Sequence, residues 1–181
     1  IIAGSQQVVR IDTETDKPID RQETAKLIAK AKELIPSSQV IIFEDYDKGV
    51  AYAKSVNKPI LLDFTGYACA NCRKMEDNVW SDKSILPILK EKVVLISLYC
   101  DRKIELPKDQ QYVSKTTGKK VVTIGNKWTD FQITRYKSNS QPLYVILNTD
   151  GEDKSKPIAY TTDIQEYKKW LEDGIAAASK K

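Results

Sequence analysis

One segment, residues 59–80, fixes more of this chain's architecture than any other. It reads PILLDFTGYACANCRKMEDNVW. An apolar run at residues 60–64 leads through a short turn into sequence with helical periodicity, and Cys69 and Cys72 lie at the junction. A Cys-x-x-Cys pair between a strand and a helix is typical of a redox-active site.

The spacing of the two cysteines assigns them different roles. Two intervening residues let the sulfurs form a disulfide within one helical turn. Cys69 would stand at the helix N-terminus, where unpaired N–H groups and the helix dipole favour an anion, so it is expected to be the thiolate-like sulfur. Cys72 would share one helix face with Met75, Glu76 and Val79. That face is expected to point inward, which makes Cys72 the sheltered, resolving thiol with a carboxylate one turn beneath it.

A second acid, Asp63, lies within the apolar run itself, between Leu62 and Phe64. A strand this apolar is expected to be buried, and burial disfavours the ionised carboxylate. Such a group can accept or return a proton when a buried thiol must be deprotonated. Asp63 is therefore a candidate proton-transfer residue.

Composition excludes several classes of protein. The chain has 181 residues, enough for one domain with a sizeable core. A formal charge of +4, with no basic block interleaved with aromatic residues, argues against nucleic acid as a partner. Three cysteines are too few for a disulfide-stapled scaffold, and the lack of histidine weakens any metal site. No metal is expected.

Targeting signals are also missing from the sequence. Its longest apolar run, residues 93–99, is far shorter than a membrane span. Polar residues soon follow Ile1, so no signal peptide is recognised, and an initial isoleucine indicates a processed form or an excised piece of a longer chain.

Periodicity and turn signals predict an α/β protein in the order β-α-β-α-β-β-α. We expect an N-terminal extension at residues 1–40, with a short strand at 8–11 and a helix over 20–35, followed by one domain at 41–181. A polar, lysine-rich insertion at 101–120 follows the second core strand. The expected strands are 40–43, 60–64, 93–99, 143–147 and 157–161, and the expected helices are 46–56, 70–80, 85–92, 125–136 and one that starts at a Thr162-x-x-Gln165 capping box and ends near Gly174.

This order, with CANC at the strand-to-helix junction, resembles the thioredoxin fold, a central mixed sheet flanked by helices. Gln141-Pro142 stands where that family has its cis-proline loop. A closer similarity, over about residues 42–175, is to the C-terminal domain of DsbD-type protein-disulfide reductases. It depends on four segments of the sequence, namely YDKGVAYAKSVNKPILLDFTGYACANCRKMEDNVW, VLISLYCDRKIELP, GNKWTDFQITRY and SQPLYVILNTDG.

The resemblance implies a function. In that family the domain accepts electrons from a membrane-embedded partner, which can be part of the same full-length chain, and passes them to oxidised envelope proteins. It implies a periplasmic location, which in the full-length protein can include a tether to the inner membrane, and no cofactor besides the Cys69–Cys72 disulfide or dithiol.

Site residues follow from the same resemblance. Cys69 matches the attacking cysteine and Cys72 the resolving one, while Asp63 and Glu76 match two acids that tune the site. Gln141 and Pro142 match the loop that faces the partner peptide.

Ala68 departs from the pattern, because thioredoxins usually have tryptophan before the first cysteine. Tyr67 is then the nearest aromatic residue, and both are expected at the substrate-contacting edge. Cys100, at the end of the strand next to the catalytic one, is either a group on the active-site side or a small, partly buried apolar residue.

Three functions fit these residues. The first is a reductase that transfers electrons to substrate disulfides, and the second is an oxidase or isomerase of the same fold. The third is a thioredoxin-fold module that binds partners without turnover. The sequence does not fix the direction of electron flow.

Overall fold

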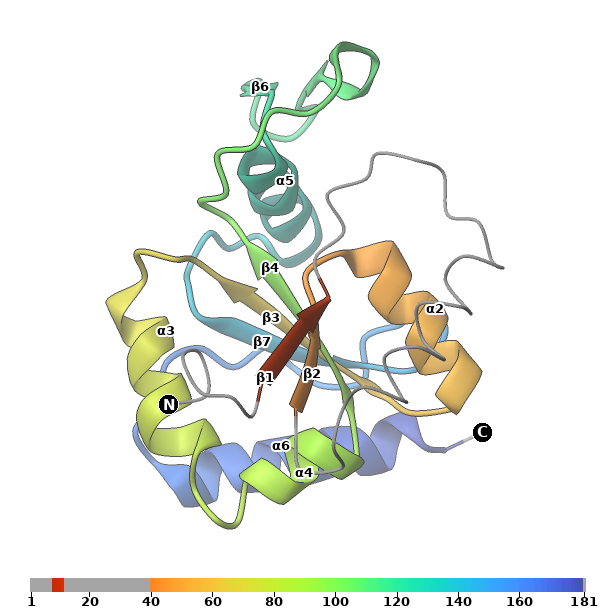
Figure 1. The fold of residues 1–181 in the computed structure, drawn as a ribbon, viewed down its shortest axis with the longest axis vertical. Coiled ribbons are helices and arrows are strands. Elements are labelled where there is room, and N and C mark those ends of the chain that lie inside the picture. Colours follow the sequence, from red (N-terminus) through yellow and green to blue (C-terminus); the bar gives the residue numbers. More distant parts are fainter. Residues whose placement is uncertain (1–7, 12–39, 181) are drawn as a thin grey trace.

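The structure, a computed structural model, describes residues 8–11 and 40–180. Among these residues the main sheet has five strands in the order β1-β2-β4-β3-β7 (Figure 1). The strands β1, β2, β4 and β3 are parallel, and β7 is antiparallel to β3. Their bounds are Val8–Ile11 for β1, Val40–Phe43 for β2, Ile60–Thr65 for β3, Val94–Tyr99 for β4 and Leu143–Leu147 for β7. This mixed sheet, flanked by helices, confirms the predicted fold class.

Side chains alternate between the two faces of the sheet, and each face has its own hydrophobic cluster. The helices α2 (Tyr46–Val56) and α5 (Ile124–Tyr136) contribute Ala53 and Trp128 to one cluster. The other cluster receives side chains from the helices that cover the opposite face. These are α3 (Ala70–Met75), the π-helix η1 (Glu76–Trp80), α4 (Leu86–Glu91) and α6 (Ile164–Ala178).

Several predicted elements are confirmed. The strands at 40–43 and 143–147 and the helix at 46–56 have the predicted bounds. The helix predicted at 70–80 consists of α3 and the π-helix that continues it. The residues predicted to share its inner face are all buried, namely Cys72, Met75, Glu76 and Val79.

The strand predicted at 157–161 is wrong. Within this range the structure has one isolated bridge, Ile158 with Tyr144, and a second bridge, Asp153 with Leu147, lies before it. The backbone of Ile158 exchanges both of its hydrogen bonds with Tyr144, at 3.0 and 2.8 Å. The ladder does not continue to Ile146, because its carbonyl accepts from the N–H of Lys154 at 2.7 Å and its N–H donates to the Ser155 hydroxyl at 2.8 Å.

Both predicted ends of the last helix are also wrong. Asp163, rather than Thr162, caps α6, because its carboxylate accepts hydrogen bonds from the N–H groups of Gln165 and Glu166. The helix continues through Gly174 to Ala178. A Cβ at Gly174 would lie 2.6 Å from Ile146 Cγ1, so this glycine allows α6 to approach the sheet closely.

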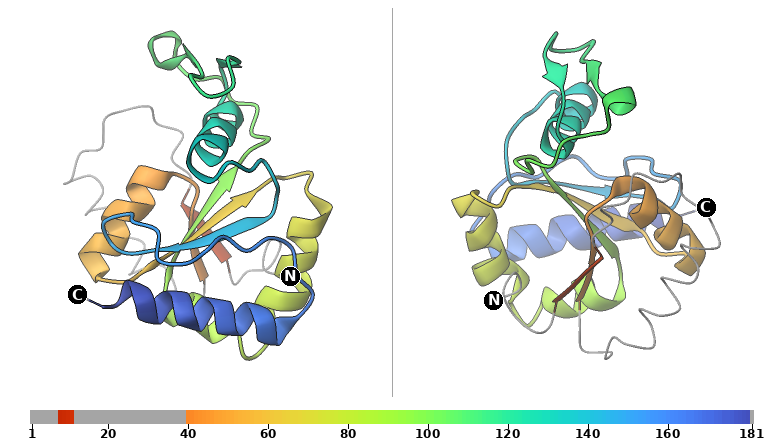
Figure 2. Two further views of the ribbon diagram at one scale, coloured as in Figure 1. Left: turned by 180° about the vertical axis from the view of Figure 1, so that it is seen from behind. Right: turned by 45° about the horizontal axis from the view of Figure 1, so that its top comes forward.

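The insertion forms a small structure of its own above the sheet (Figure 2). It holds a 3₁₀ turn at Lys108–Gln110 and a two-stranded sheet of β5 (Tyr112–Val113) and β6 (Lys120–Val121). In the N-terminal extension, the predicted strand is β1, which pairs in parallel with β2. The helix predicted at 20–35 lies outside the described residues.

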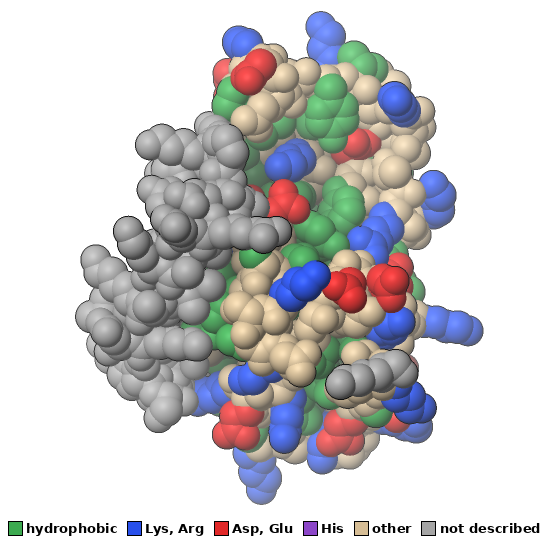
Figure 3. Space-filling model, turned by 90° about the vertical axis from the view of Figure 1, so that its right-hand side faces the viewer, with side chains coloured by type: hydrophobic (Ala, Val, Ile, Leu, Met, Phe, Trp, Pro, Cys, Tyr) green, Lys and Arg blue, Asp and Glu red, His purple; other side chains and the backbone are tan. Residues whose placement is uncertain are grey.

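Charges of both signs are mixed over the face of the molecule shown in Figure 3. Lysine and arginine side chains there are interspersed with acidic ones rather than gathered into one patch. None of the helices in the described ranges has the length and apolar character needed to cross a membrane.

The N-terminus of α5 packs directly on the turn that follows β4. The N–H of Gly125 donates to the carbonyl of Arg102 at 2.9 Å. A Cβ at Gly125 would lie 2.6 Å from the Cys100 carbonyl oxygen and 2.7 Å from the backbone N and O of Arg102. Backbone atoms cannot rotate away as a flexible side chain can, so only glycine fits this position.

We therefore expect Gly125→Ala to destabilise the protein. Alanine normally stabilises a helix by up to about 1 kcal/mol relative to glycine, but overpacking here should lower the free energy of unfolding by about 1–3 kcal/mol. Urea unfolding followed by circular dichroism measures the change. A variant as stable as the wild type would contradict the close contact.

Candidate redox site

The two cysteines form a disulfide at the start of α3, with their Cα atoms 5.3 Å apart. Cys69 is the N-cap residue and is half-buried, whereas Cys72 is 2% exposed. The backbone N–H of Cys72 points at the Cys69 sulfur, at 3.2 Å. The outer sulfur is therefore the one that a partner can reach and the one that a helix N–H group can stabilise as an anion.

Beneath α3, three polar side chains form a row across three strands. Asp63 on β3 pairs in register with Ser97 on β4 and with Tyr144 on β7. The Ser97 hydroxyl donates to Asp63 Oδ2 at 2.8 Å, and all three side chains are at most 2% exposed. Burial raises the pKa of Tyr144 well above its usual range, and the Asp63 carboxyl raises it further. The phenol therefore stays protonated beside the acid.

Glu76 is buried rather than solvated, with 5% of its surface exposed. Its Oε1 lies 2.9 Å from Nη2 of Arg73. The same guanidinium nitrogen donates to the Thr65 hydroxyl at 3.1 Å and to the Gly66 carbonyl at 3.3 Å. Arg73 thus joins the acid of the redox helix to the end of β3.

The loop with Gln141 and Pro142 reaches the same edge of the sheet. Their peptide bond is cis. Because β7 is antiparallel to β3 and Leu143 pairs with Phe64, this loop lies at the C-terminal end of β3, from which the cysteine turn departs. Figures 1 and 2 show the segment before β7 passing beside the start of α3.

Tyr67 and Ala68 are exposed in the turn before Cys69. The Tyr67 ring stacks on Tyr99 with centroids 4.1 Å apart, yet 53% of its surface is exposed. Oδ1 and Oδ2 of Asp101 accept the N–H groups of Tyr67 and Ala68, each at 2.9 Å. Stacking on Tyr99 and the hydrogen bonds from the turn to Asp101 thus keep the Tyr67 ring in a defined position in the turn before the disulfide.

Asp101, Arg73 and Ser97 belong to this site, although they were not predicted from the sequence. A Cβ at Gly66 would lie only 3.1 Å from Asp101 Oδ2, so this carboxylate is packed tightly against the turn. Two signals were available in the sequence. Ser97 is the one polar residue in an apolar strand, and Asp101 follows the end of the strand next to the catalytic one.

Cys100 packs with the apolar cluster on the α5 side of the sheet, away from α3. Burial raises the pKa of its thiol to about 12, partly offset by a hydrogen bond with Thr129. The structure therefore favours the interpretation of Cys100 as a small, partly buried residue.

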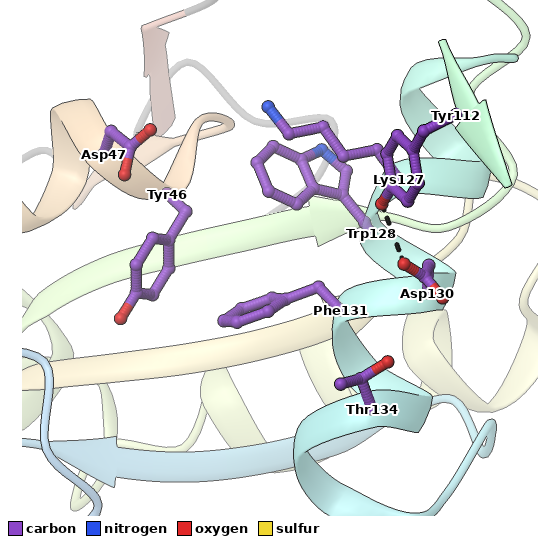
Figure 4. A pocket seen from close by; sticks show the side chains of 8 residues that line it. All are labelled: Tyr46, Asp47, Tyr112, Lys127, Trp128, Asp130, Phe131 and Thr134. Carbon is purple, nitrogen blue, oxygen red and sulfur yellow. Dashed lines mark hydrogen bonds between the residues drawn. The ribbon is translucent and has the colours of Figure 1, made fainter. Parts of the chain in front are cut away.

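Two other features concern ligands. Within the described ranges, no three histidine, cysteine, aspartate or glutamate side chains gather closely enough to hold a metal ion. Figure 4 shows a cavity of about 400 Å³ between α2, α5 and β5. It has aromatic walls and a hydrogen bond from the Tyr112 hydroxyl to Asp130 at 2.8 Å, but none of the redox-site residues lines it.

Comparison with protein families gives a match over most of this architecture. The family model described as thioredoxin-like matches residues 41–149, more than half of the chain. The solved structure of a thioredoxin from Thermus thermophilus covers 74% of this chain and 85% of its own, with a TM-score of 0.52 and 18% identity. This similarity shows the fold.

Other matches are weaker or shorter. A structure named DsbH oxidoreductase has a TM-score of 0.49 at 18% identity, covering 71% of this chain and 83% of its own. Bifunctional protein HldE from Azorhizobium caulinodans is 37% identical over 73 residues, 35% of this chain. The protein of that name from Mesorhizobium japonicum is 34% identical over 74 residues. The chain spans about 15% of the length of these two curated relatives.

Asp101→Ala should loosen the turn before the disulfide. Loss of two hydrogen bonds to an exposed carboxylate should lower the free energy of unfolding by about 1–2 kcal/mol and speed amide exchange at Tyr67 and Ala68. Urea titration and hydrogen exchange measure both effects. Asp109→Ala removes the same charge from the exposed insertion and serves as the control. Equal effects of the two variants would refute the anchoring role of Asp101.

Cys100 should be almost inert to alkylation in the folded protein. With a pKa of about 12, about one thiol in ten thousand is ionised at pH 8. In a Cys69→Ser/Cys72→Ser variant, iodoacetamide should modify Cys100 slowly at pH 8, about tenfold faster for each pH unit above that, and readily in urea. Mass spectrometry follows the reaction. Rapid labelling of the native protein at pH 8 would show that the thiol is not sheltered.

Proposed function

The chain belongs to the thioredoxin-like family, and from this premise we propose that it is a protein-disulfide reductase of the cell envelope. The observation that carries the proposal is the asymmetry of the redox pair. Cys69 is half-buried at the start of α3, and Cys72, one helical turn later, is only 2% exposed. The acids Asp63 on β3 and Glu76 on η1 are buried on the same side of the sheet as Cys72.

Catalysis begins with the dithiol. The Cys69 thiolate attacks one sulfur of a substrate disulfide, and the other substrate sulfur leaves as a thiolate. The result is a mixed disulfide between Cys69 and the substrate. The substrate segment lies extended beside Gln141 and Pro142, with Tyr67 and Ala68 at the opposite edge of the contact.

Resolution uses the inner thiol. Asp63 takes the proton of Cys72, and the Cys72 thiolate attacks the Cys69 sulfur. The substrate leaves with both of its sulfurs reduced, and the Cys69–Cys72 disulfide is formed again. Ser97, which donates to Asp63 Oδ2 at 2.8 Å, holds this carboxyl in place. Two electrons pass from the pair to the substrate in each cycle.

Charge around the pair supports the reducing direction. The carboxyl groups of Asp63 and Asp101 lie near the end of β3 and the cysteine turn. Glu76 and Arg73 form an ion pair at 2.9 Å, so these two residues together add little net charge there. Negative charge near a sulfur disfavours its thiolate. Strongly oxidising members of this class have a stabilised reduced form, and the acids here act in the opposite sense.

The partners and the location follow from the resemblance to DsbD-type reductases. After each cycle another dithiol must reduce the Cys69–Cys72 disulfide, and in that family the donor is embedded in the membrane. The substrates would be envelope proteins that carry disulfides. The chemistry needs no small-molecule cofactor, because the two cysteines carry the electrons.

The reduction potential of the pair tests this proposal directly. Equilibration in graded dithiothreitol buffers, with thiol trapping and a gel shift, gives the potential of Cys69–Cys72 in a Cys100→Ala background. We expect a value between about −270 and −200 mV. A value near about −120 mV would contradict the reductase and favour an oxidase.

Two variants separate catalysis from binding. Cys69→Ser should abolish disulfide reduction because no attacking thiol remains, whereas Cys72→Ser should accumulate the mixed disulfide, which is visible on a non-reducing gel. Asp63→Asn should slow resolution and so lengthen the life of that intermediate. A module that only binds partners would form no mixed disulfide with either cysteine variant.

A further inference from the structure

A buried amide on α5 contacts the loop that leads to Pro142. Gln132 is fully buried, at 0% exposure. Its Nε2 donates to the Ser140 carbonyl at 2.6 Å, and its Oε1 accepts from Gln141 Nε2 at 3.2 Å. An amide costs free energy to bury unless its donors and acceptors are satisfied, so both hydrogen bonds contribute to keeping the loop in this position.

The same amide also reaches the end of β4. Cys100 Sγ lies 3.7 Å from Gln132 Oε1, and the Gln141 side chain bonds to the same thiol. One turn earlier on α5, the Thr129 hydroxyl donates to the Cys100 carbonyl at 3.3 Å. The side chains of Gln132, Gln141 and Cys100, from α5, the loop and the end of β4, thus form one network. Gln132 is its fully buried member.

We propose that Gln132 is a positioning residue that sets the conformation of the loop at 140–142 for pairing with a substrate. The inference rests on the proposed function, because that function makes this loop the partner of the substrate strand. Gln132 bonds to the backbone carbonyl of Ser140 and to the side chain of Gln141, the two residues that precede Pro142. Without it, the Ser140 carbonyl and the Gln141 amide lose their anchors, and the edge presented to the substrate becomes variable.

The position of Gln132 separates this effect from the chemistry of the sulfurs. α5 packs against one face of the sheet, whereas α3, which contains Cys72, packs against the opposite face, where the Asp63 side chain also lies. Within the described part of the chain, the hydrogen bonds of the amide join it to Cys100, Ser140 and Gln141 rather than to the cysteine turn. A change at Gln132 should therefore alter substrate binding and leave the potential of Cys69–Cys72 unchanged.

Gln132→Met tests the proposal, since methionine has a similar length and volume but forms neither hydrogen bond. With a peptide disulfide as the substrate, we expect KM to rise about tenfold, with kcat and the reduction potential close to the wild-type values. Hydrogen exchange at residues 139–141 should become faster. A folded Gln132→Met variant with an unchanged KM would overturn the inference.

Controls distinguish positioning from loss of stability. Leu171→Ala removes a fully buried side chain of α6 from the opposite cluster and should lower stability without raising KM. A KM that rises equally in both variants would show that general destabilisation is the cause. If Gln132→Met does not fold, Gln132→Asn retains the amide but is one methylene shorter, and it too should raise KM.

The wild-type assay keeps the two proposals apart. A wild-type protein that reduces no peptide disulfide would overturn the proposed function together with the inference that rests on it. An active wild type with a KM insensitive to Gln132 would overturn the inference alone.

Discussion

The hydrogen-bonded ladder between β3 and β4 is the interaction on which the site depends. The two strands pair in parallel over six residues each, from Ile60 with Val94 to Thr65 with Tyr99. Both are buried on both faces. A slip of one residue would exchange the two faces of a strand, so Asp63 would lose its hydrogen bond with Ser97 and enter the apolar cluster on the α5 side. The C-terminal ends of both strands therefore stop at one edge of the sheet, and the turns that follow carry the cysteine pair and Asp101.

The pairing of β3 with its two neighbouring strands also places polar side chains inside the core. Asp63 and Ser97 are directly paired, and Tyr144 completes the row from β7. A carboxyl group in such a position is costly unless it is hydrogen-bonded. A protein selected for stability alone would favour apolar residues here. The row is consistent with the proposed transfer of a proton between Asp63 and Cys72.

The sequence predicted the central strands and the redox helix well, because their signals are local. Apolar runs mark β3 and β4, and the inward face of α3 and η1 follows from 3.6-residue periodicity. The missed features depend on other information. The predicted strand at 157–161 does not form, because Ile146 bonds to the Lys154 N–H and to the Ser155 hydroxyl, and a side-chain bond of this kind leaves no periodic pattern in the sequence.

The other features that were not predicted from the sequence depend on contacts between residues far apart in the chain. Asp101 bonds to backbone groups 33 and 34 residues earlier. Glu76 lies on the predicted inward face, but its ion pair with Arg73, whose guanidinium also reaches the end of β3, was not predicted. The sequence shows Gln132 only as a polar residue in a helix, and its burial follows from the packing of α5 on β4. Propensity and spacing describe a residue's neighbours along the chain, whereas these residues act on neighbours across the fold.

The sheet divides the molecule into two compartments. On one side are Cys72 and the row of Asp63, Ser97 and Tyr144. On the other side, α5 bonds through Gln132 to the loop at 140–142, and the insertion with β5 and β6 joins β4 to the start of that helix. If the proposed function holds, mutations that reshape the second compartment could accumulate without disturbing electron transfer. Such a division would let related proteins inherit one redox centre while each lineage acquires its own set of clients.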